Sequence, residues 1–199
     1  MADIERALVL FASGLTSAAC IAWALDRFSF VETLGIEFSA ARPIELSRRA
    51  AFRLRLRSDF PSWHSRLGND HIVRISGLAE LARVAASSAE YIDDRDEEGE
   101  RAEVEQEMPG RNLYLLAAAA TLAKTREITH VVAGIGGRGS PRPDDRKRAI
   151  DAIGEAVNLA VGTSIAFHAP LIDLDSAEIR ALATNLGGAQ FRDLIRQLG

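Results

Sequence analysis

The chain has 199 residues, of which 47% are hydrophobic and 26% charged, a composition typical of one soluble globular domain. Its net charge of -4 argues against a surface built to hold nucleic acid, and its single cysteine, Cys20, excludes an internal disulfide and a zinc site made of several cysteines. The apolar runs are far shorter than the ~20 residues that span a bilayer, and the charged N-terminus does not match a signal peptide. We therefore expect a cytoplasmic protein with no membrane and no nucleic-acid partner.

Five predicted strands alternate with predicted helices along the chain. The strands are predicted at residues 7–12, 31–38, 71–75, 128–133 and 164–168. The helices are predicted at residues 18–27, 43–57, about 76–89, 112–124, 144–161, 176–185 and 189–198. The continuous apolar run of the first strand indicates burial on both faces, Thr16 or Ser17 can cap the first helix, and Asp175 can cap the one at 176–185. The alternation predicts an α/β fold with a doubly wound, mostly parallel five-stranded sheet and helices on both faces, in a single domain over residues 1–199.

An acidic segment at about residues 91–107 departs from this pattern. Residues 93–107 contain nine acidic side chains, with Arg95 and Arg101 as the basic ones and almost no large apolar side chain. Such a stretch buries too little apolar surface to offset the entropy lost on ordering. We therefore expect an exposed loop there, and order that resumes with the helix at 112–124.

The turn after the first strand, Ala12-Ser-Gly-Leu-Thr-Ser17, is a candidate phosphate site. In parallel sheets, ligands bind beyond the carboxyl ends of the strands, near the point where the strand order reverses. A helix N-terminus offers free N–H groups and the positive end of a dipole there. Gly14 lets the backbone approach a phosphate closely, and the hydroxyls of Ser13, Thr16 and Ser17 can donate to it. The alternative interpretation is a tight turn with a capping hydroxyl.

A second glycine-rich stretch at residues 134–139 satisfies G-x-G-x-x-G after a predicted strand. Pro141 and Pro143, however, stand where the dinucleotide-binding fingerprint needs a helix N-terminus. We interpret the stretch as an irregular loop. The sequence contains no G-x-x-x-x-G-K-[ST] motif, which excludes a Walker-type phosphate loop.

The histidines and the densest run of arginines are interpreted as ordinary core or surface groups. The histidines, none of them paired at metal-ligand spacing, are His64, His71, His130 and His168. The arginines, all on one predicted helix, are Arg48, Arg49, Arg53, Arg55 and Arg57. We expect the histidines in the core or at its rim, no metal site, and the arginines on a solvated face.

The segment Met108-Pro-Gly-Arg-Asn112 lies where the acidic segment meets the next predicted helix. Arg111 and Asn112 fall at the start of that helix, where a positive side chain is poorly placed for the helix dipole. A guanidinium in this position is plausible as an anion ligand. The alternative is a solvated arginine beside an asparagine cap.

Together these segments resemble the 7-cyano-7-deazaguanine synthase family, the ExsB/QueC-type enzymes of queuosine precursor synthesis. That family belongs to the PP-loop, or adenine nucleotide alpha-hydrolase-like, superfamily. Residues 7–20 are similar to its opening strand, S-G-G-L-D-S loop and helix, and residues 36–46 to its D-Y-G-Q-R-H-x-x-E-L stretch. Residues 108–113 match its P-[AG]-R-N motif, the most specific marker here, and residues 168–179 match T-P-L-x-x-L-x-K-A-E-I. The resemblance covers nearly the whole chain, to about Leu186.

The resemblance implies an ATP-dependent carbon–nitrogen ligase. The carboxyl group of 7-carboxy-7-deazaguanine is adenylated, ammonia gives the amide, and a second ATP drives dehydration to the nitrile. ATP and Mg²⁺ are the implied cofactors, a deazaguanine-like carboxylate is the implied substrate, and a homodimer is the implied assembly. The residues implied to bind the nucleotide are Ala12, Ser13, Gly14, Leu15, Thr16, Ser17 and Phe38. Those implied to bind the substrate are Arg42, Gly110 and Asp144, and those implied to be catalytic are Arg111 and Asn112.

The sequence departs from the family pattern in three places. Thr16 stands where the loop has an acidic residue, and Ala12 where it has a serine. The glutamine-arginine-histidine stretch reads Ala40-Ala41-Arg42, and the C-terminal zinc-binding cysteines are absent, so we expect no zinc. The alternative hypothesis is a degenerate PP-loop protein that binds a nucleotide or a protein partner without this catalysis.

Overall fold

The computed structural model describes residues 5–12, 14–37, 43–75, 77, 110–135 and 143–197, and of residues 43–45 and 143–145 it describes the backbone alone. Its strands are β1 (Arg6–Leu10), β2 (Phe30–Glu37), β3 (Leu67–Arg74), β4 (His130–Val132) and β5 (Ala166–His168). Its helices are α1 (Leu15–Arg27), α2 (Pro43–Asp59), α3 (Pro61–His64), α6 (Arg111–Thr125), α7 (Pro143–Val161) and α8 (Ser176–Arg196). Within the described ranges, no helix is both long and apolar enough to cross a membrane.

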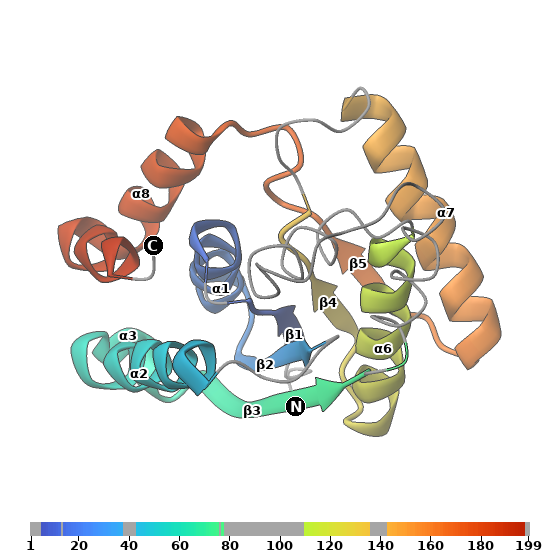
Figure 1. The fold of residues 1–199 in the computed structure, drawn as a ribbon, viewed down its shortest axis with the longest axis horizontal. Coiled ribbons are helices and arrows are strands. Elements are labelled where there is room, and N and C mark those ends of the chain that lie inside the picture. The colour runs from blue at the N-terminus through green and yellow to red at the C-terminus, as the bar shows by residue number, and fades with distance from the viewer. Residues whose placement is uncertain are drawn as a thin grey trace, which may run out of the picture.

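The described strands form one parallel sheet in the order β3-β2-β1-β4-β5 (Figure 1). The chain therefore winds outward from β1 in one direction and then returns to wind outward in the other. This confirms the predicted doubly wound α/β fold. The central β1 is buried on both faces, as its apolar run indicates, because Ala7, Leu8 and Val9 have no exposed surface.

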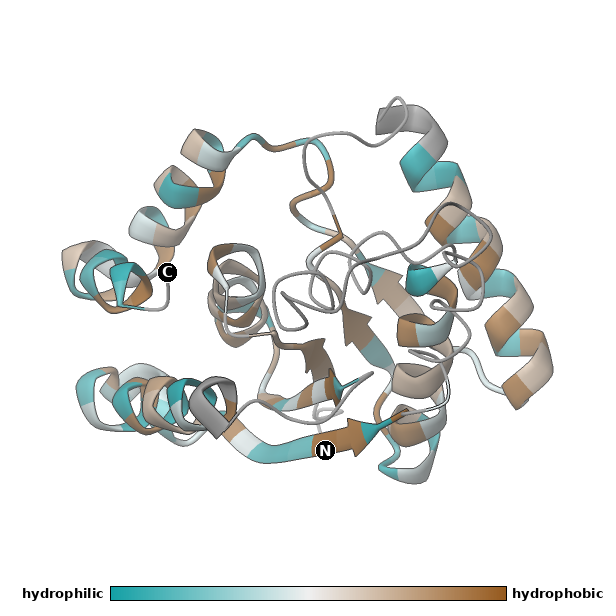
Figure 2. Ribbon diagram, in the orientation of Figure 1, coloured by the Kyte–Doolittle hydropathy of each residue, from teal (hydrophilic) through white to brown (hydrophobic). Residues whose placement is uncertain are grey.

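Two apolar cores lie on the two faces of the sheet, because helices cover both. On one face, α1, α2 and α8 pack around Leu25, Phe52 and Phe191. On the other face, α6 and α7 pack around Leu116 and Val157. Figure 2 shows the corresponding pattern, in which β1 is strongly apolar while α7 and α8 alternate between apolar and polar residues.

Several predicted boundaries shift in the structure. The third strand begins at Leu67 and not at residue 71, and the short helix α3 is an element that the sequence analysis did not predict. The two final helices are confirmed, joined across Gly188, whose φ of 70° and ψ of -170° break the helical path. The predicted helix at about 76–89 and the acidic loop at about 91–107 lie outside the described residues.

The predicted cap at Asp175 is confirmed. Its carboxylate accepts hydrogen bonds from the N–H groups of Ala177 at 2.7 Å and Glu178 at 2.9 Å. The Glu178 carboxylate accepts in turn from the Asp175 N–H at 2.8 Å. This reciprocal pair is a capping box, which fixes where α8 begins.

A fully buried carboxylate, Glu32 of β2, is neutralised near the amino edge of the sheet. Its oxygens lie 2.9 Å from Arg6, 2.9 Å from Arg126 and 2.6 Å from His71. Burial alone would raise the pKa of Glu32, but the hydrogen bonds and charges of Arg126 and His71 lower it below its ordinary value. Because Arg126 directly follows α6, this cluster also ties that helix to the sheet.

Candidate functional site

The boundary between β1 and β4 is where the strand order reverses, so the carboxyl edge of the sheet there is the position at which this fold binds ligands. The helix α1 follows β1 directly and so begins at this edge. The helix α6 ends at the opposite edge, since Arg6 at the start of β1 donates to the Arg126 carbonyl at 2.8 Å. A helix of 15 residues is about 22 Å long, which brings its first residue, Arg111, toward the carboxyl edge. Figure 1 shows the two helices on opposite sides of the sheet.

The N-terminus of α1 is capped by a glycine. Gly14 is the N-cap residue, and Leu15 is the first helical residue. The prediction that Thr16 or Ser17 caps this helix is therefore wrong. The Ser17 hydroxyl instead accepts from the Gly14 N–H at 3.2 Å and donates to the Gly14 carbonyl at 3.0 Å. Because glycine carries no capping side chain, the first-turn N–H groups keep their capacity to bind an anion.

No described side chain occupies the position to which a side chain at Gly14 would point. Among the described residues, a Cβ atom built there would come within 4 Å of the Ala12 carbonyl oxygen alone, at 3.7 Å, which is an ordinary contact. The φ of -113° and ψ of 170° at Gly14 are extended and allowed for any residue. The described residues therefore leave room for at least one further atom beside the Gly14 backbone.

The loop after β4 presses against this same turn. A Cβ atom built on Gly134 would lie 3.0 Å from the Thr16 methyl carbon and 3.4 Å from the Thr16 carbonyl carbon. Only a residue without a side chain fits this close approach without moving the turn. The structure therefore joins Gly134, which the sequence analysis placed in an irregular loop, to the candidate phosphate turn.

The arginine run on α2 corrects a prediction. Arg49 and Arg53 are 4% and 8% exposed and do not lie on a solvated face. The Arg49 guanidinium donates to the Phe11 carbonyl and lies over the Phe11 ring, 4.7 Å from its centroid. It also makes two hydrogen bonds to the Asp70 carboxylate, one of them at 2.9 Å from Nε. Since Phe11 directly precedes the candidate phosphate turn, Arg49 fixes the backbone from which that turn departs.

The network around Arg49 is completed by Thr33 and Arg53. The Thr33 hydroxyl donates to Asp70 at 2.5 Å and accepts from Arg53 at 2.6 Å. Burial would raise the pKa of Asp70, but hydrogen bonds from Arg49 and Thr33 lower it. Burial lowers the pKa of Arg53 to about 10, so Arg53 remains charged at neutral pH.

A spacing signal for these buried arginines exists in the sequence. Arg49, Arg53 and Arg57 recur every four residues, which aligns them on one face of a helix. Arg57 donates to the Gly68 carbonyl at 2.9 Å but is exposed, and Arg48 and Arg55 are exposed as well, as predicted for all three. The spacing was visible, but the partner strand β3 was predicted too short to supply Asp70.

The histidines are less scattered than their spacing suggests. The Nδ1 atom of His130 and the Nε2 atom of His168 lie 3.1 Å apart on neighbouring strands. Both rings pack against Phe28, and burial together with His130 lowers the pKa of His168. His130 and His168 therefore lie in or beside the core, as expected, whereas His64 is exposed and contradicts the expectation. Among the described residues, no group of three or more metal-ligating side chains occurs.

Arg111 and Asn112 begin α6, as predicted, and both side chains are half-buried. The N-cap of that helix is Gly110, in the left-handed conformation with φ of 74°, so Asn112 is not the cap. Ser13, Phe38 and Arg42 lie outside the described residues, and of Asp144 only the backbone is described. The structure thus brings the turn at Gly14 together with Gly134 and Arg49, and directs the start of α6 toward the same edge.

Comparison with known proteins gives a consistent result. A family model described as queuosine biosynthesis protein QueC matches residues 6–195. The chain is 40% identical over 190 residues to the 7-cyano-7-deazaguanine synthase of Methylorubrum extorquens, covering 95% of this chain and 76% of that one. It is 42% identical over 194 residues to the synthase of Nitrobacter hamburgensis, covering 97% and 80%.

A solved structure supports the fold. The chain is similar to a 4-thiouridine synthetase in complex with RNA and with bound ATP, with a TM-score of 0.57 and 15% identity. The likeness covers 94% of this chain and 42% of that chain. At this level of identity, the comparison concerns the arrangement of helices and strands.

Proposed function

We propose a function for this chain from its membership of the QueC family of queuosine biosynthesis proteins. It is an ATP-dependent carbon–nitrogen ligase that converts 7-carboxy-7-deazaguanine into 7-cyano-7-deazaguanine. In this reaction the substrate carboxylate attacks the α-phosphorus of ATP and pyrophosphate leaves. Ammonia then displaces AMP to give the amide. Transfer of a second adenylyl group to the amide oxygen lets AMP leave with the loss of two protons, which forms the nitrile.

The observation that carries this proposal is the glycine-capped N-terminus of α1 at the point where the strand order reverses. Adenylyl transfer requires little covalent work from a protein and depends on positioned donors around the phosphates. The first-turn N–H groups and the positive end of the α1 dipole supply such donors. Because Gly14 carries no side chain, a phosphate can approach the backbone there closely.

Residues around this turn hold its backbone in place or face the charge of the reacting groups. Gly134 keeps the turn in place through its contact with Thr16, and Arg49 holds the Phe11 carbonyl just before it. We assign Arg111 and Asn112 to the charge that develops on the phosphates and the substrate carboxylate. Because the α6 dipole disfavours a cation at its N-terminus, Arg111 gains stability there when an anion binds beside it.

We assign the remaining predicted residues to the rim of this site. They are Ala12, Ser13, Leu15, Ser17 and Phe38 toward the nucleotide, and Arg42, Gly110 and Asp144 toward the deazaguanine carboxylate. The described residues fit ATP better than they fit a protein-held Mg²⁺. Mg²⁺ in nucleotide sites is bound by one or two carboxylates together with the phosphates, and the turn offers the Thr16 hydroxyl where its relatives' pattern has an acid. We therefore assign no step to a metal held by this turn.

The test is ATP consumption that depends on the carboxylate substrate. Purified protein with ATP, ammonia and 7-carboxy-7-deazaguanine is expected to release pyrophosphate, and omission of the carboxylate is expected to stop the release. Gly14→Val is the matched variant, because its uncharged side chain fits the described backbone and fills the space that we assign to a phosphate. Release that is unchanged in Gly14→Val would contradict the assignment of the site.

Thr16 favours a second candidate function, a member that binds the nucleotide without turnover. A neutral hydroxyl cannot orient a cation or a polar network as a carboxylate does. This candidate predicts that ATP raises the melting temperature of the wild-type protein, but not of Gly14→Val, while no pyrophosphate is released.

A further inference from the structure

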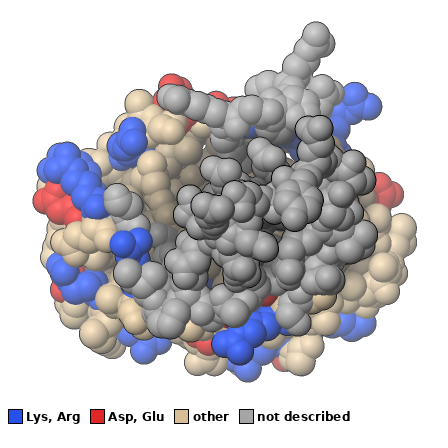
Figure 3. Space-filling model, in the orientation of Figure 1, with Lys and Arg blue, Asp and Glu red and all other residues tan. Residues whose placement is uncertain are grey.

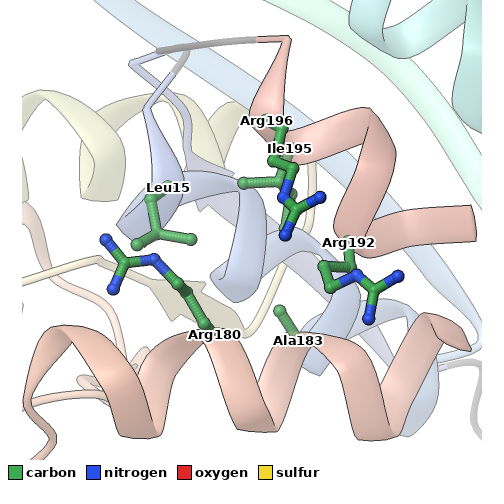
Figure 4. Close-up of a pocket in the computed structure, with 6 residues that line it drawn as sticks. All are labelled: Leu15, Arg180, Ala183, Arg192, Ile195 and Arg196. Atoms are coloured by element: carbon green, nitrogen blue, oxygen red, sulfur yellow. The ribbon is translucent and has the colours of Figure 1, made fainter. Parts of the chain in front are cut away.

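A pocket between α1 and α8 is lined by three arginines. It has a volume of about 350 Å³, within the range of small-molecule sites. Its lining residues are Leu15, Arg180, Ala183, Arg192, Ile195 and Arg196. Figure 4 shows Arg180, Arg192 and Arg196 around the same space, with Leu15 beside Arg180. Figure 3 shows basic side chains on the side of the molecule where α8 lies in Figure 1.

The kink at Gly188 creates this pocket. Arg180 lies in the half of α8 before Gly188, and Arg192 and Arg196 lie in the half after it. In a straight helix, residues 180 and 196 would be about 24 Å apart along the axis, too far to line one small pocket. The positive φ of 70° at Gly188 turns the chain, so that both halves of α8 contribute arginines to the lining of the same cavity.

The charge of the pocket is unbalanced among the described residues. Asp193 pairs weakly with two of the arginines, at 3.4 Å from Arg192 and 3.7 Å from Arg196. Glu178, the acidic residue in the first turn of α8, is held in the capping box at Asp175 and does not line the pocket. Three arginines thus line one pocket, and a bound anion would reduce the repulsion among their charges.

The floor and the position of the pocket restrict the ligand further. Ala183 and Ile195 are buried and apolar, and Leu15 is the first residue of α1. An anion in the pocket therefore lies beside the positive end of the α1 dipole, next to the turn at Gly14 but outside it. Guanidinium groups bind phosphate oxygens through paired, charge-assisted hydrogen bonds.

We propose that this pocket is a second anion site that binds a phosphate-bearing small molecule through Arg180, Arg192 and Arg196, separate from the phosphates held at Gly14. The shared chemistry is a phosphate or diphosphate group, supplied either by an inorganic anion or by the phosphate end of an organic ligand. This site does not depend on the catalytic activity proposed above, because its cations belong to α8 and not to the turn.

The experiment is calorimetric titration of the full chain with inorganic pyrophosphate, and separately with AMP, at constant ionic strength. The double variant Arg192→Ser/Arg196→Ser removes two exposed cations and is expected to weaken the binding of pyrophosphate at least tenfold. Arg148→Ser, which removes an exposed arginine from α7, is the matched control and is expected to bind as the wild type does. Binding of pyrophosphate alone identifies an inorganic anion, and binding of both ligands with loss of both in the double variant identifies a site for organic phosphates.

Gly14→Val separates this proposal from the proposed function. It is expected to lose the binding of ATP at the turn and to keep the pyrophosphate binding that depends on Arg192 and Arg196. Pyrophosphate binding that is lost in Gly14→Val and unchanged in the double variant would place the anion at the turn and overturn the second site. Equal binding in the wild type and the double variant, or no binding at all, would also overturn it.

Discussion

Replacement of Arg49 by methionine tests whether the buried arginine network holds the turn that follows β1. Methionine keeps the apolar stem but removes the guanidinium, which leaves the Asp70 carboxylate without its main partner and the Phe11 carbonyl without its donor. Breaking a buried ion pair from one side costs about 3–5 kcal/mol. Asp70 is 25% exposed and keeps Arg53 at 3.7 Å, so the lower end applies, and we expect a loss of about 3 kcal/mol.

Urea unfolding followed by far-ultraviolet circular dichroism measures this loss. Arg48→Met is the control, because Arg48 neighbours Arg49 on α2 but is exposed, and we expect it to change the free energy of unfolding by less than about 0.5 kcal/mol. The double variant Arg49→Met/Asp70→Asn should recover about 2 kcal/mol relative to the sum of the two single changes. Equal losses in Arg49→Met and Arg48→Met would show that the buried network does not hold the turn. A double variant that loses as much stability as the two single variants together would show the same.

Three further predictions concern the acid stability, the turn and the thiol. Glu32 has a lowered pKa, so its stabilisation is present above about pH 4.3, the pKa of an unfolded glutamate, and is lost as the pH falls through the lower folded value. Glu32→Gln should therefore be less stable than the wild type at pH 7, and it should lose less stability between pH 5 and about pH 3. Urea titrations at each pH measure the free energy of unfolding of both proteins. Parallel pH profiles of the two free energies would contradict this prediction. Gly134→Val should weaken ATP binding about tenfold, or about 1.4 kcal/mol, because its Cβ displaces Thr16. Calorimetric titration with ATP measures this affinity. Unchanged affinity would show that the contact between Gly134 and Thr16 does not position the turn. Burial raises the pKa of Cys20 to about 12, so a thiol reagent should modify it only after denaturation, and rapid labelling of the folded protein would contradict its burial.

The sheet was predictable because its strands carry strong local signals. The apolar run at 7–12 and the alternation with helices determine the order of the elements, and Asp175 signals the start of α8 through its capping box. The start of β3 was missed because Gly68, Asn69 and Asp70 have the composition of a turn. Tertiary contacts hold these residues in a strand, since Asp70 accepts hydrogen bonds from α2 and β2.

The site was predictable only in part. The turn at Gly14 follows from its position after a buried strand, but the cap was misplaced because glycine gives no side-chain signal for a cap. The role of Arg49 depends on a partner far away in sequence, so composition alone indicates a solvated arginine. The pocket on α8 depends on the backbone angle at Gly188, which the sequence marks only as a break between two helices.

The activity that we propose for this chain is the formation of a nitrile from a carboxylate, ATP and ammonia. The most direct measurement is mass spectrometry of the deazaguanine product after incubation with isotopically labelled ammonia. We predict that the wild-type protein, but not Gly14→Val, forms 7-cyano-7-deazaguanine with the label in its nitrile nitrogen. Unchanged 7-carboxy-7-deazaguanine in the wild-type reaction, with ATP and ammonia in excess, would contradict it.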